Sequence, residues 1–343
     1  MLYANVVLCR KPGEFDAPLS YAVPVALEGQ LGIGRFVRVP FRSQVMQGIV
    51  VALLSELPAG MNSRKIKPLQ EALPEPALSP IQIQLAAAME HYYHASLTRV
   101  LRMMMPKAVW EGRFKIPEAK ALNPAHEKTP ERTLTSAQAQ ALEKMERSEK
   151  PILLHGVTGS GKTELYLRMI LKTVTGGKQA LMLLPEIALT PQTVDYFKAF
   201  LGDAIEVFHS RLTEKQRAAG WWRVKRGKAK LVIGSRSAIF APFLELGLIA
   251  IDEEHEWTYK QESAPYYETH RVAEQRAAQS GAVLILGSAT PRLESYHRAR
   301  TGDYERVILD RRVHQSGLPA IQVVDLREEF KKRNFSIFSR ALQ

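Results

Sequence analysis

The chain has 343 residues, of which 45% are hydrophobic and 24% charged, so it can bury a core in two or three domains. Its single cysteine, Cys9, excludes an internal disulfide and a zinc site built from cysteines. No apolar run reaches the length of a membrane span, and the N-terminus lacks the layout of a secretory signal. We therefore expect a cytoplasmic protein with no membrane partner.

The formal net charge of +12 favours a polyanionic partner such as nucleic acid. General solubility would explain the same charge equally well. Charge alone therefore leaves both interpretations open.

Residues 1 to about 75 are predicted to be β-rich, because short runs of β-branched and aromatic residues alternate with turn-forming residues. The run 35–42 (RFVRVPFR) interleaves arginines with aromatic residues, a pattern typical of surfaces that bind single-stranded nucleic acid. We predict that Arg35 and Arg38 bind DNA. An ordinary half-buried strand with solvated arginines is the alternative.

A helix is expected to begin at Ser79 and Pro80, because serine caps helices and proline fits the first turn. Residues 111–133 are polar, contain three prolines and show no sustained apolar period, which predicts a linker. The predicted organisation is a β-rich domain with a C-terminal helix at 1–110, this linker, and a second domain at 134–343.

From residue 134 onwards, apolar strand candidates alternate with amphipathic segments of helix length. Continuous apolar strands separated by helices predict a parallel sheet with helices on both faces. The second domain is therefore predicted to be an α/β domain. Ligands of such sheets bind at the carboxyl ends of the strands.

The segment 156–163 reads GVTGSGKT and matches the phosphate-binding loop of nucleoside triphosphatases. An apolar run precedes it and a segment of helical periodicity follows, which is the context that the motif requires. Backbone N–H groups of such a loop surround phosphates, Lys162 reaches the β- and γ-phosphates, and the Thr163 hydroxyl holds Mg²⁺. A chance match in a glycine-rich loop is the alternative. The predicted nucleotide-binding residues are Gly156, Val157, Thr158, Gly159, Ser160, Gly161, Lys162 and Thr163.

The apolar run 248–251 is followed by the sequence DEEH. We predict that Asp252 holds Mg²⁺, directly or through water, and that Glu253 orients and deprotonates the attacking water. Together with Lys162, these residues are the predicted catalytic group. Ser288 and Thr290, after another apolar run, are predicted to hydrogen-bond the acidic motif and sense the γ-phosphate, although such residues also cap helices.

In this order, GVTGSGKT, DEEH and GSAT resemble motifs I, II and III of superfamily 2 helicases. Four segments are similar to the PriA family of primosomal replication-restart helicases, also called primosomal protein N′. The N-terminal runs RFVRVPF and GIVV resemble the family's domain for the 3′ end of a nascent DNA strand. The four segments are 183–192 (LLPEIALTPQ), 208–217 (FHSRLTEKQR), 234–243 (GSRSAIFAPF) and 252–273.

The resemblance implies a RecA-like helicase lobe 1 at 134–343 that binds ATP and Mg²⁺, with Gln138 reading the adenine. It also implies an aromatic-rich loop at 257–267 that couples DNA binding to hydrolysis, with side chains that can stack on bases; a packing cluster is the alternative. The implied DNA-binding residues are Thr190, Gln192, Ser235, Arg236, Trp257, Tyr259, Lys260, Tyr266 and Tyr267. The implied coupling residues are His255, Ser288 and Thr290.

Three features depart from the family pattern. The family usually carries a winged-helix module between these two domains, and here the linker is too short to contain it. Ser20 stands where the family has an acidic residue that helps to recognise a 3′-hydroxyl end. The second motor lobe, its arginine finger and the family's zinc-binding cysteines are missing, so we expect a chain truncated after the first lobe.

The sequence therefore predicts an ATP-dependent 3′-to-5′ DNA helicase of the PriA type that acts at stalled replication forks and in primosome assembly. Forked and single-stranded DNA are the expected ligands, and the resemblance adds single-stranded DNA-binding protein and other primosome proteins as partners. We expect the chain alone to be weak or inactive in unwinding. The alternatives are a non-catalytic module that binds fork DNA or scaffolds the primosome, and an RNA helicase or restriction translocase, which the N-terminal domain and aromatic loop disfavour.

Overall fold

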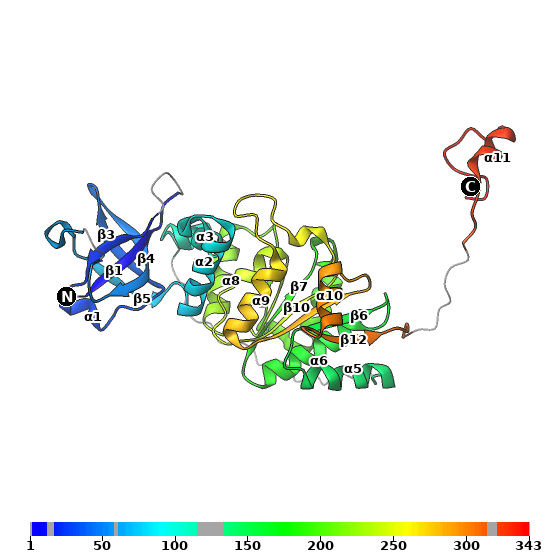
Figure 1. Ribbon diagram of the computed structural model, residues 1–343, viewed down its shortest axis with the longest axis horizontal. Helices are drawn as coiled ribbons and strands as arrows, with labels where there is room; N and C mark the ends of the chain where they lie inside the picture. Colours follow the sequence, from blue (N-terminus) through cyan, green and yellow to red (C-terminus); the bar gives the residue numbers. More distant parts are fainter. Residues whose placement is uncertain (1, 12–16, 58–60, 115–132, 314–320, 343) are drawn as a thin grey trace.

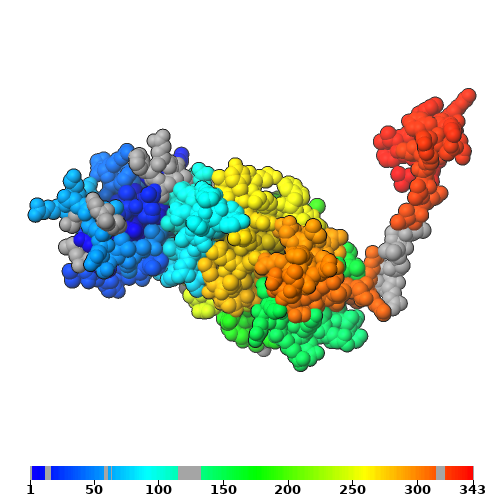
Figure 2. Space-filling model, in the orientation of Figure 1, coloured from blue at the N-terminus to red at the C-terminus, as the bar shows by residue number. Residues whose placement is uncertain are grey.

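The computed structural model describes residues 2–11, 17–57, 61–114, 133–313 and 321–342. A β-rich unit, a group of helices and a larger α/β unit follow one another along the longest axis (Figure 1). Residues 321–342, which include α11 (Leu326–Lys331), stand apart from the rest (Figure 2). Most of the predicted linker, residues 115–132, lies outside the described residues, so its boundaries remain a prediction.

The N-terminal unit is a five-stranded sheet in the order β2-β1-β4-β3-β5, and all its paired strands are antiparallel. Along β3, Val37 and Val39 pack into the interior of this unit, whereas Phe36 points to the opposite side and joins the core under the helices. This alternation follows from the two-residue period of a strand. The strands are β1 (Tyr3–Leu8), β2 (Leu19–Ala22), β3 (Arg35–Phe41), β4 (Gln44–Leu54) and β5 (Glu71–Pro76), with a short α1 (Val25–Glu28) and the 3₁₀ turn η1 (Ser63–Lys65).

Three helices follow: α2 (Pro80–Tyr93), α3 (Leu97–Met103) and α4 (Lys107–Trp110). Ser79 caps α2 as predicted: its side chain accepts a hydrogen bond from the Gln82 N–H, and Gln82 returns one to the Ser79 N–H. Such a reciprocal box satisfies two N–H groups that the helix leaves unpaired.

The α/β unit contains a seven-stranded sheet in the order β12-β6-β11-β10-β7-β9-β8, in which all paired strands are parallel. This confirms the predicted fold class, a RecA-like parallel-sheet lobe preceded by a β-rich domain. The edge strand β12 was not predicted, because its five residues begin with two charged ones and leave an apolar run of only three. The strands are β6 (Ile152–Gly156), β7 (Gln179–Leu183), β8 (Ile205–Phe208), β9 (Leu231–Gly234), β10 (Leu246–Ile251), β11 (Val283–Ser288) and β12 (Glu305–Leu309).

Helices cover both faces of this sheet. Apolar side chains of α5, α6 and α7 pack on one face, and those of α8 and α9 pack on the other. The helices are α5 (Ser136–Arg147), α6 (Lys162–Thr175), α7 (Pro191–Leu201), α8 (Glu214–Lys225), α9 (Thr269–Ser280) and α10 (Leu293–Thr301). Short 3₁₀ segments are η2 (Glu186–Ala188), η3 (Gly202–Ala204), η4 (Arg236–Phe240) and η5 (Trp257–Tyr259). None of the helices in the described part of the chain has the length and apolar character needed to cross a membrane.

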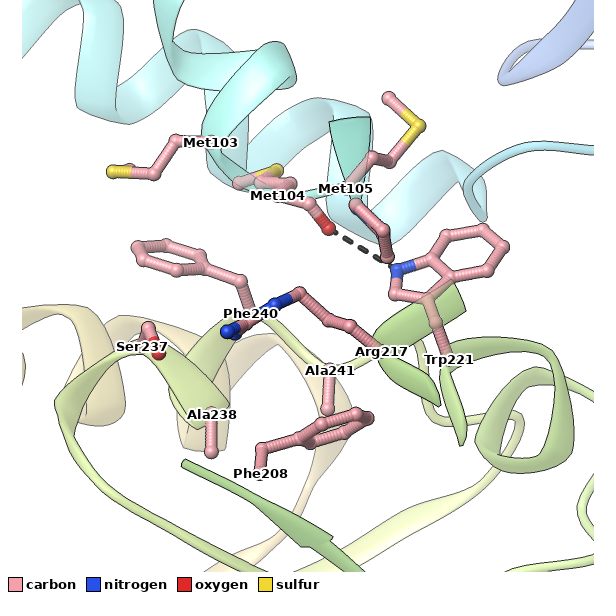
Figure 3. Close-up of a pocket in the computed structure, with 11 residues that line it drawn as sticks. Met103, Met104, Met105, Phe208, Arg217, Trp221, Ser237, Ala238, Phe240 and Ala241 are labelled. Carbon is pink, nitrogen blue, oxygen red and sulfur yellow. Dashed lines mark hydrogen bonds between the residues drawn. The ribbon is translucent and has the colours of Figure 1, made fainter. Parts of the chain in front are cut away.

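The N-terminal helices are packed directly on the α/β unit. One apolar cluster runs without a break from the five-stranded sheet, through α2–α4, to α8 and α9. The Trp221 Nε1–H donates a hydrogen bond of 3.2 Å to the Met104 carbonyl oxygen beside a small cavity of about 70 Å³ (Figure 3). Arg226 pairs with Glu75 at 2.6 Å. The β-rich unit is thus joined to the α/β unit by a shared core.

We expect Trp221→Phe to lower the free energy of unfolding by about 1–3 kcal/mol, because the buried Met104 carbonyl loses its donor while most of the packing remains. Urea denaturation of the chain measures this. Trp257→Phe is the control, since the Trp257 side chain is exposed and should tolerate the change. Equal stabilities of the two variants would contradict the role of the Trp221 contact.

Candidate active site and nucleic-acid interface

The phosphate loop connects β6 to α6 at the carboxyl end of the sheet. Gly159 and Gly161 have φ angles of +79° and +86°, a region that glycine adopts without strain. A Cβ atom on Gly161 would also lie 2.1 Å from the Gln138 side-chain nitrogen. Backbone conformation is therefore the main reason that the turn favours glycine, because the end of the Gln138 side chain can rotate away from a Cβ atom.

Lys162 begins α6 and is almost fully buried. Its ammonium donates to the Gly156 carbonyl oxygen at 2.9 Å and lies 4.0 Å from a carboxylate oxygen of Glu253. The loop and the acidic motif, about 90 residues apart along the chain, therefore meet at one edge of the sheet. A lysine in this position can approach the outer phosphates of a bound nucleotide.

Asp252 follows β10 and is fixed by two tyrosines. The Tyr166 hydroxyl donates to its carboxylate at 2.9 Å, and the Tyr259 hydroxyl donates to its backbone oxygen at 2.8 Å. Burial raises the pKa of Asp252, and the neighbouring Glu253 charge raises it further, while Tyr166 and Lys162 oppose the change. Oxygen donors such as the Asp252 carboxylate and the Thr163 hydroxyl suit Mg²⁺, and both residues line the same cavity.

Glu253 has a φ angle of +45°, which is uncommon for a residue with a side chain and marks local backbone strain. Its carboxylate lies 3.6 Å from His255 Nδ1, and the same nitrogen lies 2.8 Å from the Ser288 hydroxyl. Ser288 in turn accepts a hydrogen bond from the Thr290 N–H at 2.9 Å. The three predicted coupling residues thus form one chain of contacts that ends at Glu253.

Glu254 is a structural residue that the sequence reasoning did not single out. Its side chain is completely buried and accepts hydrogen bonds from the Arg292 N–H and the Ser295 hydroxyl. Burial alone would raise the pKa of Glu254, but these bonds and nearby His270 hold it below its ordinary value. The sequence signal for this network was the third acidic residue of DEEH, close to the end of an apolar strand, because a buried carboxylate requires hydrogen-bond donors.

The cavity between these groups has a volume of about 570 Å³, within the range of small-ligand sites. Gln138 lines it and is held by the Thr135 N–H and the Ser160 carbonyl oxygen, both at 3.0 Å. An amide side chain has two N–H donors and two acceptor lone pairs. After these two hydrogen bonds, Gln138 retains one N–H donor and one acceptor lone pair. That pair matches the N6 and N7 edge of adenine.

Gln192 lines this cavity, because it lies on the first turn of α7 beside the phosphate loop, and its predicted DNA contact remains a prediction. Thr190 caps that helix by accepting from the Thr193 N–H at 3.2 Å. Its hydroxyl therefore already serves the helix, and its DNA contact remains a prediction.

A second hollow of about 340 Å³ includes Ser235, Arg236 and Trp257 in its lining. The Arg236 guanidinium donates to the backbone oxygens of Thr258, at 2.8 Å, and Lys260. It thereby fixes the start of the aromatic-rich loop. Trp257 is 70% exposed and Tyr266 57% exposed, so both rings are available to stack on bases.

The prediction that Tyr259 and Tyr267 stack on DNA bases is wrong. Tyr259 and Tyr267 are only 2% and 1% exposed, and Tyr267 packs edge-on against Phe240 with ring centroids 5.0 Å apart. A ring enclosed in the core has no face free for a base. For these two residues the alternative, a packing cluster, holds.

In the N-terminal sheet, Arg35 donates to the Leu73 and Pro74 carbonyl oxygens at 2.9 and 2.8 Å. Arg38 forms a half-exposed ion pair of 3.3 Å with Glu71. Both arginines are thus engaged within the sheet, and their DNA contacts remain predictions. Ser20 donates to the Asn5 side-chain oxygen at 2.8 Å.

Comparison with known proteins agrees with this division of the chain. Residues 5–106 match the family described as 3′ DNA-binding domain (3′BD) of PriA, and residues 135–299 match the DEAD/DEAH box helicase family. The replication restart protein PriA of Rickettsia conorii is 36% identical over 318 residues, which are 92% of this chain and 48% of that protein. PriA of Bacillus subtilis is 48% identical over 217 residues, 62% of this chain and 27% of that protein.

The chain belongs to the PriA family. It corresponds to the N-terminal part of these proteins, with the 3′ DNA-binding domain followed by a superfamily 2 helicase lobe, which confirms the resemblance predicted from the sequence. This PriA-family chain spans less than half the length of those two relatives. Among its described residues, no group of three or more histidine, cysteine or acidic side chains is placed to hold a metal ion.

We expect Asp252→Asn to raise the free energy of unfolding near neutral pH, by on the order of 1 kcal/mol. Folding raises the pKa of Asp252, so the folded state loses stability as the pH rises from the ordinary carboxyl range through the raised pKa. Asparagine carries no charge, so the free energy of unfolding of this variant should not fall in the same way as the pH rises. Urea denaturation across the pH range, with the exposed Asp195→Asn as control, measures it. A pH-independent difference between Asp252→Asn and the unmodified chain would contradict the assignment.

Proposed function

We propose that the chain provides the DNA-end-binding and ATP-binding parts of a 3′-to-5′ DNA helicase that acts in the restart of stalled replication forks and in primosome assembly. The observation that carries this proposal is the meeting of Lys162 with Asp252 and Glu253 in one cavity, with 4.0 Å between the Lys162 and Glu253 charges. That set of groups suits phosphoryl transfer to water.

The residues have distinct parts in this reaction. Lys162 and the backbone N–H groups of the loop hold the phosphates, and Gln138 offers its free donor and acceptor to the base. Glu253 orients the attacking water and takes its proton. Thr163 and Asp252 would hold Mg²⁺, which would supply positive charge to stabilise the negative charge of the phosphates.

Coupling to DNA runs through the loop that starts at Trp257. A base stacked on the exposed Trp257 would move η5, which ends at Tyr259. The Tyr259 hydroxyl holds the backbone of Asp252, so a small shift of η5 reaches the catalytic carboxylates. Arg236 fixes the same loop from its other side. DNA binding can therefore reposition Glu253 without a large movement.

The complete helicase activity requires more than this lobe. Related nucleoside triphosphatases gain about 10³ to 10⁵ in rate from an arginine supplied from outside the phosphate loop. We therefore propose that the chain alone binds ATP and DNA weakly and does not unwind duplex DNA. We further propose a cytoplasmic location, with single-stranded DNA-binding protein and other primosome proteins as its partners.

We expect Glu253→Gln to reduce DNA-stimulated ATP hydrolysis at least about 100-fold, because it removes the general base, while ATP binding persists. Steady-state hydrolysis with forked DNA, beside fluorescent-nucleotide binding, measures both. The neighbouring Glu256→Gln is the matched control.

Lys162→Ala should lose nucleotide binding in the same assay. Unchanged hydrolysis in Glu253→Gln, or unchanged binding in Lys162→Ala, would contradict the proposed active site. ATP-dependent unwinding by the unmodified chain would contradict the need for a second lobe.

For the DNA interface, we expect Trp257→Ala to weaken the binding of single-stranded DNA by about 1–3 kcal/mol, the usual contribution of one stacked base. Fluorescence anisotropy at fixed salt measures the affinity. Leu244→Ala, another exposed apolar residue that lines neither cavity, is the control. Equal affinities of the two variants would remove Trp257 from the DNA interface.

A further inference from the structure

The chain turns back along the phosphate loop after the edge strand β12. We call residues 309–313 the strap. The Val157 N–H donates to the Leu309 carbonyl oxygen at 3.1 Å, and the Val313 N–H donates to the Gly159 carbonyl oxygen at 2.9 Å. Two backbone hydrogen bonds therefore fix the strap beside the loop, independently of its side chains.

Val313 is the member of the strap that lines the nucleotide cavity. One of its methyl groups lies 3.2 Å from the position that a Cβ on Gly161 would occupy, and the Gln138 amide nitrogen lies 2.1 Å from the same position. Val313 and Gln138 therefore flank the same glycine. This is the part of the cavity nearest to the residue that reads the adenine edge.

The chemistry of the two side chains is complementary. Gln138 has one N–H donor and one acceptor lone pair left for the polar edge of a base, as counted above. Val313 is 42% exposed. Its methyl groups form an apolar surface beside the polar backbone of the phosphate loop. A purine has a polar edge and an apolar face, so the two side chains suit its two kinds of surface.

We propose that Val313 packs against the face of the adenine ring and that the strap forms the base-binding wall of the ATP site. This inference rests on the proposed function, since it concerns the same cavity. It assigns a part of nucleotide recognition to a segment that follows the last helicase motif, GSAT at 287–290, by about 20 residues. The strap thus belongs to the nucleotide site, although its sequence carries no nucleotide-binding motif.

The test separates binding of the base from binding of the phosphates. We expect Val313→Ala to raise the dissociation constant for ATP about three- to tenfold, since each buried methyl group contributes a factor of a few. Affinity for inorganic tripolyphosphate, which has no base, should stay unchanged. Val313→Ile, which keeps a branched apolar side chain, should bind ATP as tightly as the unmodified chain. Ile308→Ala, on the exposed side of β12, should bind both ligands normally.

Each other outcome has a definite meaning. No change in ATP affinity for Val313→Ala overturns the proposal, and so does an equal loss for ATP and tripolyphosphate, because the variant would then act on the phosphate loop. Lys162→Ala, measured in parallel, should weaken both ligands. If Lys162→Ala weakens the binding of both ligands while Val313→Ala has no effect, the proposed ATP site is supported and only the strap proposal fails.

Discussion

The charges gathered at the carboxyl edge of the parallel sheet constrain the rest of the α/β unit. Asp252, Glu253 and Lys162 lie in one cavity, where a charge without partners would be costly. Lys162 therefore lies near Glu253, and a tyrosine from α6 donates to Asp252. The glycines of the phosphate loop allow this tight turn, because Gly159 and Gly161 have positive φ angles that other residues rarely adopt. The backbone strain at Glu253 lies at this same edge, and such strain is common at functional sites.

The aromatic-rich loop is attached to this edge by contacts with backbone atoms. Arg236 holds the backbone of the aromatic-rich loop, and Tyr259 ties the end of η5 to Asp252. Trp257 and Tyr266 are left exposed on the same loop. The loop is thus fixed on one side and has exposed rings on the other, an arrangement that suits the coupling proposed above.

The N-terminal unit is attached to the same network. The Tyr93 hydroxyl, at the end of α2, accepts a hydrogen bond from the Glu268 N–H at 3.1 Å, and the Arg271 guanidinium lies 3.6 Å from the centroid of the Tyr92 ring. Glu268 pairs with Arg292, whose N–H holds Glu254. The shared core and these contacts place the 3′ DNA-binding domain and the catalytic edge in one continuous body.

The sequence by itself determined the two units, the parallel sheet and the nucleotide loop, because each depends on local patterns. GVTGSGKT needs a strand before it and a helix after it, and continuous apolar runs mark buried strands. It also placed Asp252 and Glu253, since they follow such a run directly. The edge strand β12 escaped prediction because one of its faces is exposed and its pattern is accordingly mixed.

Only the tertiary structure decided which aromatic side chains are free. The local sequence does not distinguish the four aromatic residues of the loop. The core nevertheless encloses Tyr259 and Tyr267 and leaves Trp257 and Tyr266 exposed, because burial depends on which elements pack over the loop. The same holds for Gln192, which the start of α7 turns toward the nucleotide cavity, and for Val313, which a backbone hydrogen bond brings to Gly159 from more than 150 residues away. Contacts between segments so far apart leave no local pattern, so the sequence specified the chemistry of the site and the packing selected the residues that take part.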